Sequence, residues 1–596
     1  MKKKNNKRVL PLICIDKRIV QVKGVINKNE RGAGMNNCEF FLIDSMEKIF
    51  PDVTDMEGIQ KKHRLDKMTI FKGERAAFQL VYYKEKGNNH FSDGSGFYYE
   101  ILNAPCKERV REIQLVSSDF PCYDIADEWY ITEKPGLFPD LLLPHASNFV
   151  KFISGQYRSL WIDFPKTEDA SEGTYDITVN IYKENPNETK TEPLKSFHFE
   201  LKILEEKLEK QKLIHTEWFH ADCIADYYKV PVFSEKHWDA IEKQVAICGE
   251  ELGINMILTP VFTPPLDTDI GGERTTVQLV DVTKCDDERY EFDFSKLKRW
   301  CEICKKHEIE YLEMPHLFTQ WGAKAAPKVV VKVNGKEEKL FGWHTPALSE
   351  EYQSFIKQLI PSLQQVLLSC GYDREHIYFH ISDEPNNDNL ESYKAASDSV
   401  IHLFDGWNVI DALSEYTFYE QGIVKHPVAA NDHIDPFLKN NVKNVWVYYC
   451  CAQSVNVPNR FFAMPSYRNR IMGVLMYIFD IEGFLHWGFN FYNSQCSRRH
   501  IDPFYVTHAD YAFPSGDAFL VYPGENNEPY SSIRAEVQRQ ALDDLRALTL
   551  LEKRIGREKV LEIIKEGWEG EPSFENYPHQ DDYVKKLREK MAEYMS

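Results

Sequence analysis

The chain contains no hydrophobic run long enough to cross a bilayer. No stretch of its 596 residues approaches 18 consecutive apolar side chains, the length at which a membrane helix becomes a candidate. Near the N-terminus, the apolar run over residues 9–15 is short and is interrupted by Pro11, and no small-residue cleavage site follows it. We therefore expect a protein with neither a membrane span nor a secretory signal, located in the cytoplasm.

Basic side chains are fewer than acidic side chains over most of the chain. The sequence has 72 Lys and Arg against 92 Asp and Glu, a net charge of −20. A surplus of negative charge of this size repels a phosphate backbone. We therefore exclude nucleic acid as a partner.

The first 35 residues differ in charge from the rest. They hold ten Lys or Arg against only two acidic side chains, Asp16 and Glu30. The segment 30–34, directly before Met35, is what a purine-rich ribosome-binding site would encode if it were translated. We expect synthesis to begin naturally at Met35, and residues 1–35 to be a basic leader outside the fold.

Nucleotide-binding motifs are missing, and the cysteines follow no regular spacing. No G-x-G-x-x-G or Walker sequence follows any strand-like segment, which argues against nucleotide chemistry. The thirteen cysteines are an odd number at ordinary density, as is typical of reduced thiols in a cytoplasm. We expect no cofactor.

One cysteine pair has a spacing found in metal sites. Cys301-x-x-Cys304, followed by His307, resembles half of a zinc site. However, Leu297, Trp300 and the two cysteines recur at helical spacing, and no second pair follows. The pattern favours a buried helix face over a metal site.

Residues 36–205 have the pattern of an antiparallel β-sandwich domain. Short segments rich in β-branched and aromatic residues alternate with turn-forming residues such as those of 86–89 and 185–187. In the segment 174–182, Tyr175, Ile177 and Val179 fall on one face. Two packed sheets are the simplest way to bury such faces.

Residues 206–596 repeat a strand, loop and helix pattern. We predict eight strands, over 213–218, 254–259, 311–317, 377–382, 409–413, 428–430, 442–450 and 483–489. Helices are predicted between them, and a long one over 531–555 belongs to a C-terminal helical extension. Eight such strands predict a (β/α)8 barrel, so the fold class is a β-sandwich followed by a barrel.

The ends of the predicted barrel strands carry polar and aromatic side chains. Barrel enzymes place catalytic groups at the C-terminal ends of their strands. Aromatic residues make up 13% of the chain, and although a sandwich core explains part of this excess, rings at a barrel mouth can stack on sugar faces. The mouth is therefore suited to a carbohydrate.

The sharpest local feature is an apolar strand that runs into two adjacent acids. The segment 377–382 is followed by Asp383, Glu384 and then Pro385, which cannot continue a strand ladder. At a strand end both carboxyls can turn toward the mouth, and two close carboxyls push their pKa values apart. The alternative is a structural role in the N-terminal cap or first turn of a helix.

Several motifs in order resemble one known family. They are the segments 264–268, 272–282, 380–385, 483–490, 519–524 and 532–534. Together they resemble the β-N-acetylgalactosaminidases of glycoside hydrolase family 123, and the wider group of barrel proteins with a domain of unknown function. The resemblance covers most of residues 210–550, and the family's N-terminal sandwich corresponds to 36–205.

The resemblance implies a retaining mechanism in which the 2-acetamido oxygen of the substrate attacks C1 and gives an oxazolinium intermediate. Transferred to this sequence, Asp383 would orient and stabilise the acetamido nitrogen. Glu384 would protonate the glycosidic oxygen and then activate water. The family scheme requires no metal and no cofactor.

Seven further side chains are candidates for substrate binding, on position alone. Trp487 is a candidate floor for the sugar, and the hydroxyls of Tyr416 and Tyr448 are candidate donors to the acetamido carbonyl. His215 and His316 are candidates for hydroxyl binding, and Arg274 and Asp267 for a charged clamp. Each has a structural alternative: core packing for the rings, and a loop-stabilising ion pair for the last two.

We therefore expect an exo-glycosidase that removes terminal β-linked N-acetylgalactosamine from an oligosaccharide or glycoconjugate. A barrel glycosidase for a different sugar and a non-catalytic carbohydrate-binding protein are the alternatives. The acid pair disfavours the second of these. The sequence does not distinguish galacto from gluco configuration at C4, and it is compatible with a homo-oligomer.

Overall fold

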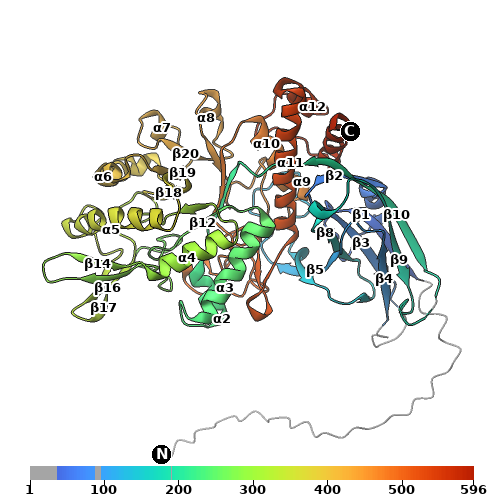
Figure 1. Cartoon of the computed structure of the whole chain (residues 1–596), viewed down its shortest axis with the longest axis horizontal. Coiled ribbons are helices and arrows are strands. Elements are labelled where there is room, and N and C mark those ends of the chain that lie inside the picture. The colour runs from blue at the N-terminus through green and yellow to red at the C-terminus, as the bar shows by residue number, and fades with distance from the viewer. Residues whose placement is uncertain (1–36, 87–94, 190, 596) are drawn as a thin grey trace, which may run out of the picture.

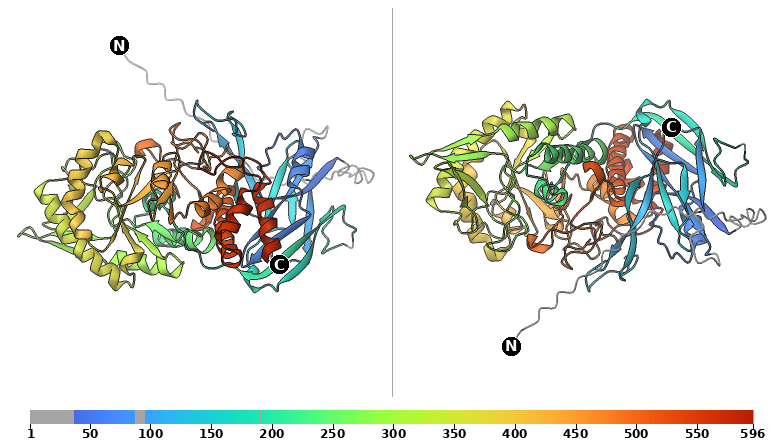
Figure 2. Two further views of the ribbon diagram at one scale, coloured as in Figure 1. Left: turned by 90° about the horizontal axis from the view of Figure 1, so that it is seen from above. Right: turned by 90° about the horizontal axis from the view of Figure 1, so that it is seen from below.

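The computed structural model describes residues 37–86, 95–189 and 191–595. The segment 1–35, for which we expect a leader, lies outside this range. Two β-rich bodies lie side by side along the longest axis of the molecule, with helices between them (Figure 1; Figure 2). Within the described ranges, no helix is both long and apolar enough to cross a membrane.

The N-terminal body is a sandwich of two sheets, each with five strands in the described residues. The first sheet has the order β1 (Cys38–Asp44), β3 (Ala76–Lys84), β8 (Arg158–Phe164), β5 (Arg109–Ser118) and β6 (Gly136–Pro144). The second has the order β2 (Lys67–Lys72), β10 (Lys195–Lys207), β9 (Gly173–Tyr182), β4 (Gly96–Leu102) and β7 (Phe149–Lys151). Neighbouring strands are antiparallel except β2 and β10, which are parallel. The predicted sandwich is confirmed.

The sandwich core forms because apolar side chains alternate along the strands. Ile177, Val179 and Ile181 of β9 are buried, and they belong to one hydrophobic cluster with Phe78 of β3 and Phe199 of β10. The Phe78 and Phe199 rings meet edge to face with centroids 5.1 Å apart. The alternation of apolar side chains along the strands therefore forms the inner faces of both sheets.

The second body is built around a closed barrel of parallel strands, and it confirms the predicted architecture. In the part of the chain that is described, the barrel has the order β11 (Ile214–Glu217), β12 (Met256–Leu258), β15 (Tyr311–Glu313), β18 (Ile377–Phe379), β19 (Asn408–Leu413), β20 (His426–Ala430), β21 (Trp446–Tyr448) and β22 (Gly483–His486). Each lies within, or within two residues of, a predicted strand segment.

Helices connect the barrel strands and continue beyond them. They are α2 (Ala221–Tyr228), α3 (Glu235–Ala246), α4 (Ser295–Lys306), α5 (Glu350–Ser369), α6 (Leu390–Val400), α7 (Thr417–Glu420), α8 (Asp435–Lys439), α9 (Ser466–Arg470), α10 (Met472–Ile478), α11 (Ile533–Ile555), α12 (Arg557–Lys565) and α13 (Tyr583–Met595). A short helix, α1 (Met56–His63), lies in the sandwich. The cysteines of the C-x-x-C motif, Cys301 and Cys304, are buried on α4. The histidine that follows them, His307, contacts Glu250 through Nδ1 at 2.6 Å.

The segments after the second and third barrel strands contain four further short strands. Strands β13 (Asp281–Lys284), β14 (Tyr290–Asp293), β16 (Val329–Val333) and β17 (Lys336–Phe341) form a small separate sheet. Asn334 and Gly335 join β16 to β17 with φ angles of 49° and 78°. Such a positive-φ Asn-Gly pair favours a tight hairpin, so this hairpin was visible in the sequence.

Helix α11 holds the two bodies together (Figure 1). Arg534 of α11 makes a two-pronged ion pair with Asp140 of β6, with Nε to Oδ1 at 2.8 Å and Nη2 to Oδ2 at 2.9 Å. Both side chains are about 1% exposed. The same guanidinium donates through Nη1 to the carbonyls of Gly516 and Phe519. The sandwich therefore fixes a loop that reaches the barrel mouth.

Candidate active site

A cavity of about 150 Å³ lies at the carboxyl end of the barrel. Its walls come from segments that follow or end the barrel strands β11, β12, β15, β18, β19, β21 and β22. The lining residues are Trp218, Leu266, Asp267, Gln320, Trp321, Asp383, Glu384, Ala412, Tyr448, Cys450, Cys451, Leu485, Trp487 and Phe513. This is the end of a barrel at which catalytic groups are found.

The two adjacent acids both line this cavity. Adjacent side chains of a regular strand point to opposite faces. Glu384, however, has a φ of 41°, so the chain turns sharply after Asp383 and brings both carboxyls to one space. A left-handed conformation at a residue other than glycine costs about 1–3 kcal/mol. Such strain persists only where the surrounding contacts hold it.

The two carboxyls differ in their hydrogen bonds. Oη of Tyr448 donates to Oε1 of Glu384 at 2.8 Å. Among the described residues, no backbone or side-chain group donates to the Asp383 carboxylate. Asp383 therefore keeps its acceptor oxygens for a ligand, while Glu384 is already held by the protein.

Burial raises the pKa of both carboxyls. For Asp383 burial is the largest cause, and the neighbouring Glu384 charge raises the pKa further, to well above the usual range. For Glu384 burial also dominates, the Tyr448 hydrogen bond lowers the pKa, and Asp432 and Asp517 raise it. Both shifts favour the protonated form, more strongly at Asp383, so the pair can hold a proton for acid and base work.

A buried charged network lies beneath the pair. Nε2 of His380 contacts Oε1 of Glu313 at 2.6 Å, and its Nδ1 contacts Oδ1 of Asp411 at 3.1 Å. Burial lowers the pKa of His380, but the hydrogen bonds to Asp411 and Glu313 outweigh it and raise this pKa to about 9. Trp218, a cavity residue, donates through Nε1 to Glu313 at 2.7 Å. The network therefore fixes the position of Trp218 in the cavity wall.

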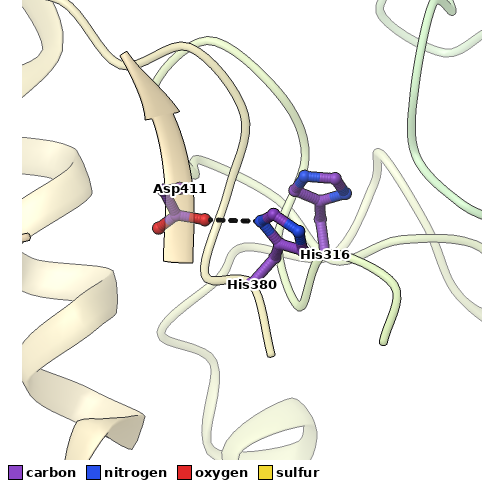
Figure 3. Close-up of side chains that lie close together, drawn as sticks. All are labelled: His316, His380 and Asp411. Atoms are coloured by element: carbon purple, nitrogen blue, oxygen red, sulfur yellow. Dashed lines mark hydrogen bonds and ion pairs between the residues drawn. The ribbon is translucent and has the colours of Figure 1, made fainter. Parts of the chain in front are cut away.

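Three of the described side chains lie close enough together to be considered as metal ligands. They are His316, His380 and Asp411, whose potential ligand atoms lie within 4.8 Å of one another (Figure 3). Both nitrogens of His380 already contact carboxylates, and its raised pKa keeps the ring protonated near neutral pH. A protonated imidazole has no lone pair to offer a metal. The arrangement favours a charge network.

Trp487 lies in the cavity wall and is fixed by a buried acid. Its Nε1 donates to Oδ2 of Asp517 at 3.0 Å. The ring meets those of Phe491 and Phe513 at centroid distances of 5.0 and 5.3 Å. Asp517 lies in the loop whose carbonyls Arg534 holds. The sandwich thus supports a cavity residue through a chain of contacts.

Asp267 contributes a third carboxyl to the cavity. Its backbone nitrogen donates to Oε1 of Gln320 at 2.5 Å, and its carbonyl accepts from Oγ of Ser497 at 2.8 Å. Its Oδ2 is buried and has no partner among the described residues. Burial raises the pKa of Asp267 to about 6. Of the seven positional candidates, Asp267, Tyr448 and Trp487 line the cavity.

The other four candidates lie outside the cavity lining. His215 contacts Glu217 and Gln538 in the interior, and Tyr416 packs edge to face on Phe437 with centroids 5.1 Å apart. Arg274 is 4% exposed and forms an ion pair at 2.7 Å with Asp222, not with Asp267.

The fourth, His316, is completely buried, and its ring centroid lies 4.2 Å from that of His380 (Figure 3). Burial and the His380 charge lower the pKa of His316 well below its usual range. The ring is therefore neutral and faces the charge network.

The structure also adds cavity residues that our candidate list did not contain. Trp321 lies in the segment after β15, and Phe513 lies in the long segment after β22. Cys450 and Cys451 follow directly after β21. A tryptophan followed by glycine in the loop after a barrel strand was the available signal for Trp321, whereas nothing in the sequence pointed to Phe513.

Comparison with known proteins identifies the family of the chain. The catalytic-domain model of glycoside hydrolase family 123 matches residues 218–551, which is more than half of the chain and contains the acid pair. The chain belongs to glycoside hydrolase family 123. It is therefore a glycosidase, and its substrates are glycans. A search of curated proteins found no match.

A solved structure of a family 123 enzyme shows the same architecture. A family 123 glycoside hydrolase from Clostridium perfringens has a TM-score of 0.69 and 15% identity, with 94% of this chain and 98% of that chain covered. At this identity the likeness shows the fold. A β-glucuronidase from Bifidobacterium dentium has a TM-score of only 0.29 at 9% identity, covering 85% of this chain and 67% of that one, which is too low to indicate a shared fold.

Proposed function

We propose that this family 123 glycosidase removes terminal β-linked N-acetylgalactosamine with retention of configuration, and that the 2-acetamido group of the substrate is the nucleophile. The observation that carries the proposal is the presence of Asp383 and Glu384 in one cavity, where, among the described residues, a side-chain donor holds Glu384 and none holds Asp383. An acid and a separate acceptor are what an internal nucleophile requires.

In the first step Asp383 accepts a hydrogen bond from the acetamido N–H, and the acetamido oxygen attacks C1. The bond from C1 to the glycosidic oxygen breaks as Glu384 gives its proton to that oxygen. The positive charge of the oxazolinium ring is balanced by the Asp383 carboxylate. Without substrate the stronger rise in pKa favours the proton on Asp383. The acetamido N–H donates to an ionised Asp383, so a bound substrate favours the state in which the proton lies on Glu384.

In the second step water attacks C1 from the face that the aglycone has left. Glu384, now ionised, takes a proton from the water, and the bond from C1 to the acetamido oxygen breaks. The acetamido group is restored, and the pair returns to its starting protonation state. Two inversions at C1 give overall retention.

The remaining cavity side chains have roles in binding. The Trp487 ring offers a flat apolar face for the C–H side of the sugar, fixed in place by Asp517. The free Oδ2 of Asp267 is an acceptor for a sugar hydroxyl. Tyr448 donates to Glu384, and on substrate binding its hydroxyl can instead donate to the acetamido carbonyl. Exo action is part of the proposal, with one terminal sugar bound beside the acid pair.

The glycan is proposed to be part of a larger conjugate. The Clostridium perfringens enzyme is described as hydrolysing glycolipid glycans, and a glycoconjugate or a released oligosaccharide is the corresponding partner here. We propose the cytoplasm as the site of action, because the odd number and irregular spacing of the cysteines are typical of reduced thiols.

A panel of aryl β-glycosides tests the proposal. The panel varies the configuration at C4 and the presence of the 2-acetamido group, with one aryl leaving group throughout. We expect hydrolysis of the N-acetylgalactosaminide and negligible turnover of the matching 2-hydroxy galactoside. Preference for a 2-hydroxy sugar would indicate a different glycosidase, and binding without turnover of any member would indicate a carbohydrate-binding protein.

A further inference from the structure

Trp321 is a large aromatic side chain that is exposed at the acid pair. It is 49% exposed and lines the same cavity as Asp383 and Glu384. The other exposed aromatic side chains among the described residues, Trp129, Tyr505, Tyr511 and Tyr594, do not line the cavity. A half-exposed indole beside catalytic groups therefore stands apart from the scattered apolar residues that any surface shows.

The backbone of Trp321 is tied to the segment that carries the acids. The amides of Leu317 and Phe318 donate to the carbonyls of His380 and Ile381 at 3.2 and 3.0 Å. The amide of Trp321 then donates to the carbonyl of Asp383 at 3.1 Å. The segment after β15 thus runs beside the segment after β18, and the indole has a fixed place relative to the acid pair.

The turn at Trp321 has an unusual conformation that its surroundings hold. Trp321, Gly322 and Ala323 have φ angles of 58°, 115° and 53°, and a left-handed conformation at tryptophan is costly. A side chain at Gly322 would approach Cβ of Asn389 to 2.8 Å, so the turn is packed closely against the segment before α6. A packed turn presents the ring more rigidly than an open loop would.

The position of Trp321 points to the second sugar of the substrate. In the proposed reaction Glu384 protonates the oxygen between two sugar residues, so both residues must lie beside it. The terminal sugar is assigned to the inner wall at Trp487, which is half-buried and held by Asp517. Trp321 is the more exposed of the two rings, so it lies on the side where the second sugar would extend toward solvent.

We propose that Trp321 is the stacking platform for the sugar residue attached directly to the terminal N-acetylhexosamine. Its ligand is a pyranose that presents an apolar C–H face to the indole. This inference rests on the proposed function and deepens it, because it makes the second sugar a determinant of specificity.

Two variants distinguish the effect of the Trp321 ring from the effect of its backbone conformation. Trp321→Asn removes the ring while using a residue that tolerates positive φ, and Trp321→Phe retains an aromatic face. Both are compared with wild type on two substrates with the same terminal sugar: a disaccharide with a second pyranose, and a glycosyl azide whose leaving group is too small to stack. Tyr505→Ala removes an exposed ring outside the cavity and is the matched control.

We expect Trp321→Asn to lower kcat/KM for the disaccharide by about tenfold, the order expected for one aromatic stacking contact, and Trp321→Phe to recover most of it. For both Trp321 variants, turnover of the azide and inhibition by the free monosaccharide should stay within about twofold of wild type. Tyr505→Ala should stay within the same limits for the disaccharide, the azide and the monosaccharide.

Equal losses on disaccharide and azide, with weaker inhibition by the monosaccharide, would place Trp321 against the terminal sugar and overturn the inference. Unchanged turnover of both substrates would also overturn it. If wild type cleaved neither substrate, the proposed function would fail first and this inference with it. Wild-type turnover of the azide therefore distinguishes the two failures.

Discussion

Tyr448 donates a hydrogen bond of 2.8 Å to Glu384 across the cavity, from the end of β21 to the segment after β18. This bond stabilises the ionised carboxylate and so lowers the pKa of Glu384, against burial and the charges of Asp432 and Asp517, which raise it. Tyr448 and the two aspartates therefore have opposite effects on the pKa of Glu384, the group that donates the proton in the proposed mechanism.

Replacing Tyr448 should move the alkaline limit of activity upward. Glu384 must be protonated to act as an acid, so activity falls as pH rises through its pKa. In Tyr448→Phe the hydrogen bond that lowers this pKa is lost, and the proton is retained to higher pH. The pH dependence of kcat/KM for an N-acetylgalactosaminide measures this. An unchanged or lower alkaline limit would show that Glu384 is not the group that titrates.

Replacing Asp517 should move the same limit in the opposite direction. The negative charge of Asp517 raises the pKa of Glu384, so Asp517→Asn should cause the proton to leave at lower pH. The asparagine oxygen can still accept from Trp487, which keeps the ring in place. A shift in the same direction as that of Tyr448→Phe would contradict the electrostatic account.

The two acids should differ in their dependence on the leaving group. Glu384→Gln should reduce turnover of substrates with poor leaving groups by about 10²–10⁴-fold, and spare activated aryl glycosides, because only the former need protonation. Asp383→Asn should impair both classes, since the acetamido group loses its charged partner. Steady-state kinetics on a series of aryl and alkyl glycosides measures this. Equal tolerance of both changes would remove the pair from the mechanism.

The ion pair between the two bodies should be a major contributor to stability. Asp140→Ala leaves Arg534 buried without its counter-charge, and breaking a buried pair in this way costs about 3–5 kcal/mol. Glu235→Ala is the matched control, because its pair with Arg299 is exposed and such pairs contribute little to stability. Urea denaturation measures both. Similar losses would show that the contact between the bodies is dispensable.

The sequence predicted the architecture because the strands carry strong periodic signals. The alternation of Ile177, Val179 and Ile181 in β9 and the apolar run into Asp383 each follow from local chemistry. Asp383 and Glu384 were found because a strand must end where two acids and Pro385 occur. No contact from a distant part of the chain was needed for either prediction.

The remainder of the site depends on contacts that sequence spacing does not encode. His316 and His215 follow or lie in barrel strands, yet both pack into buried networks, because the direction of a side chain at a strand end depends on the next strands and loops. Arg274 is paired with Asp222, which is 52 residues away. Phe513 reaches the cavity through a loop held by Arg534.

The most direct test of the central claim is the response of kcat/KM to fluorine in the N-acyl group of the substrate. Aryl β-galactosaminides with zero to three fluorines on the acetyl carbon differ mainly in the electron density of the carbonyl oxygen. If that oxygen attacks C1 beside Asp383 and Glu384, kcat/KM falls with each added fluorine. A kcat/KM that does not depend on fluorine content would assign the nucleophile to the protein or to water, and would contradict the mechanism.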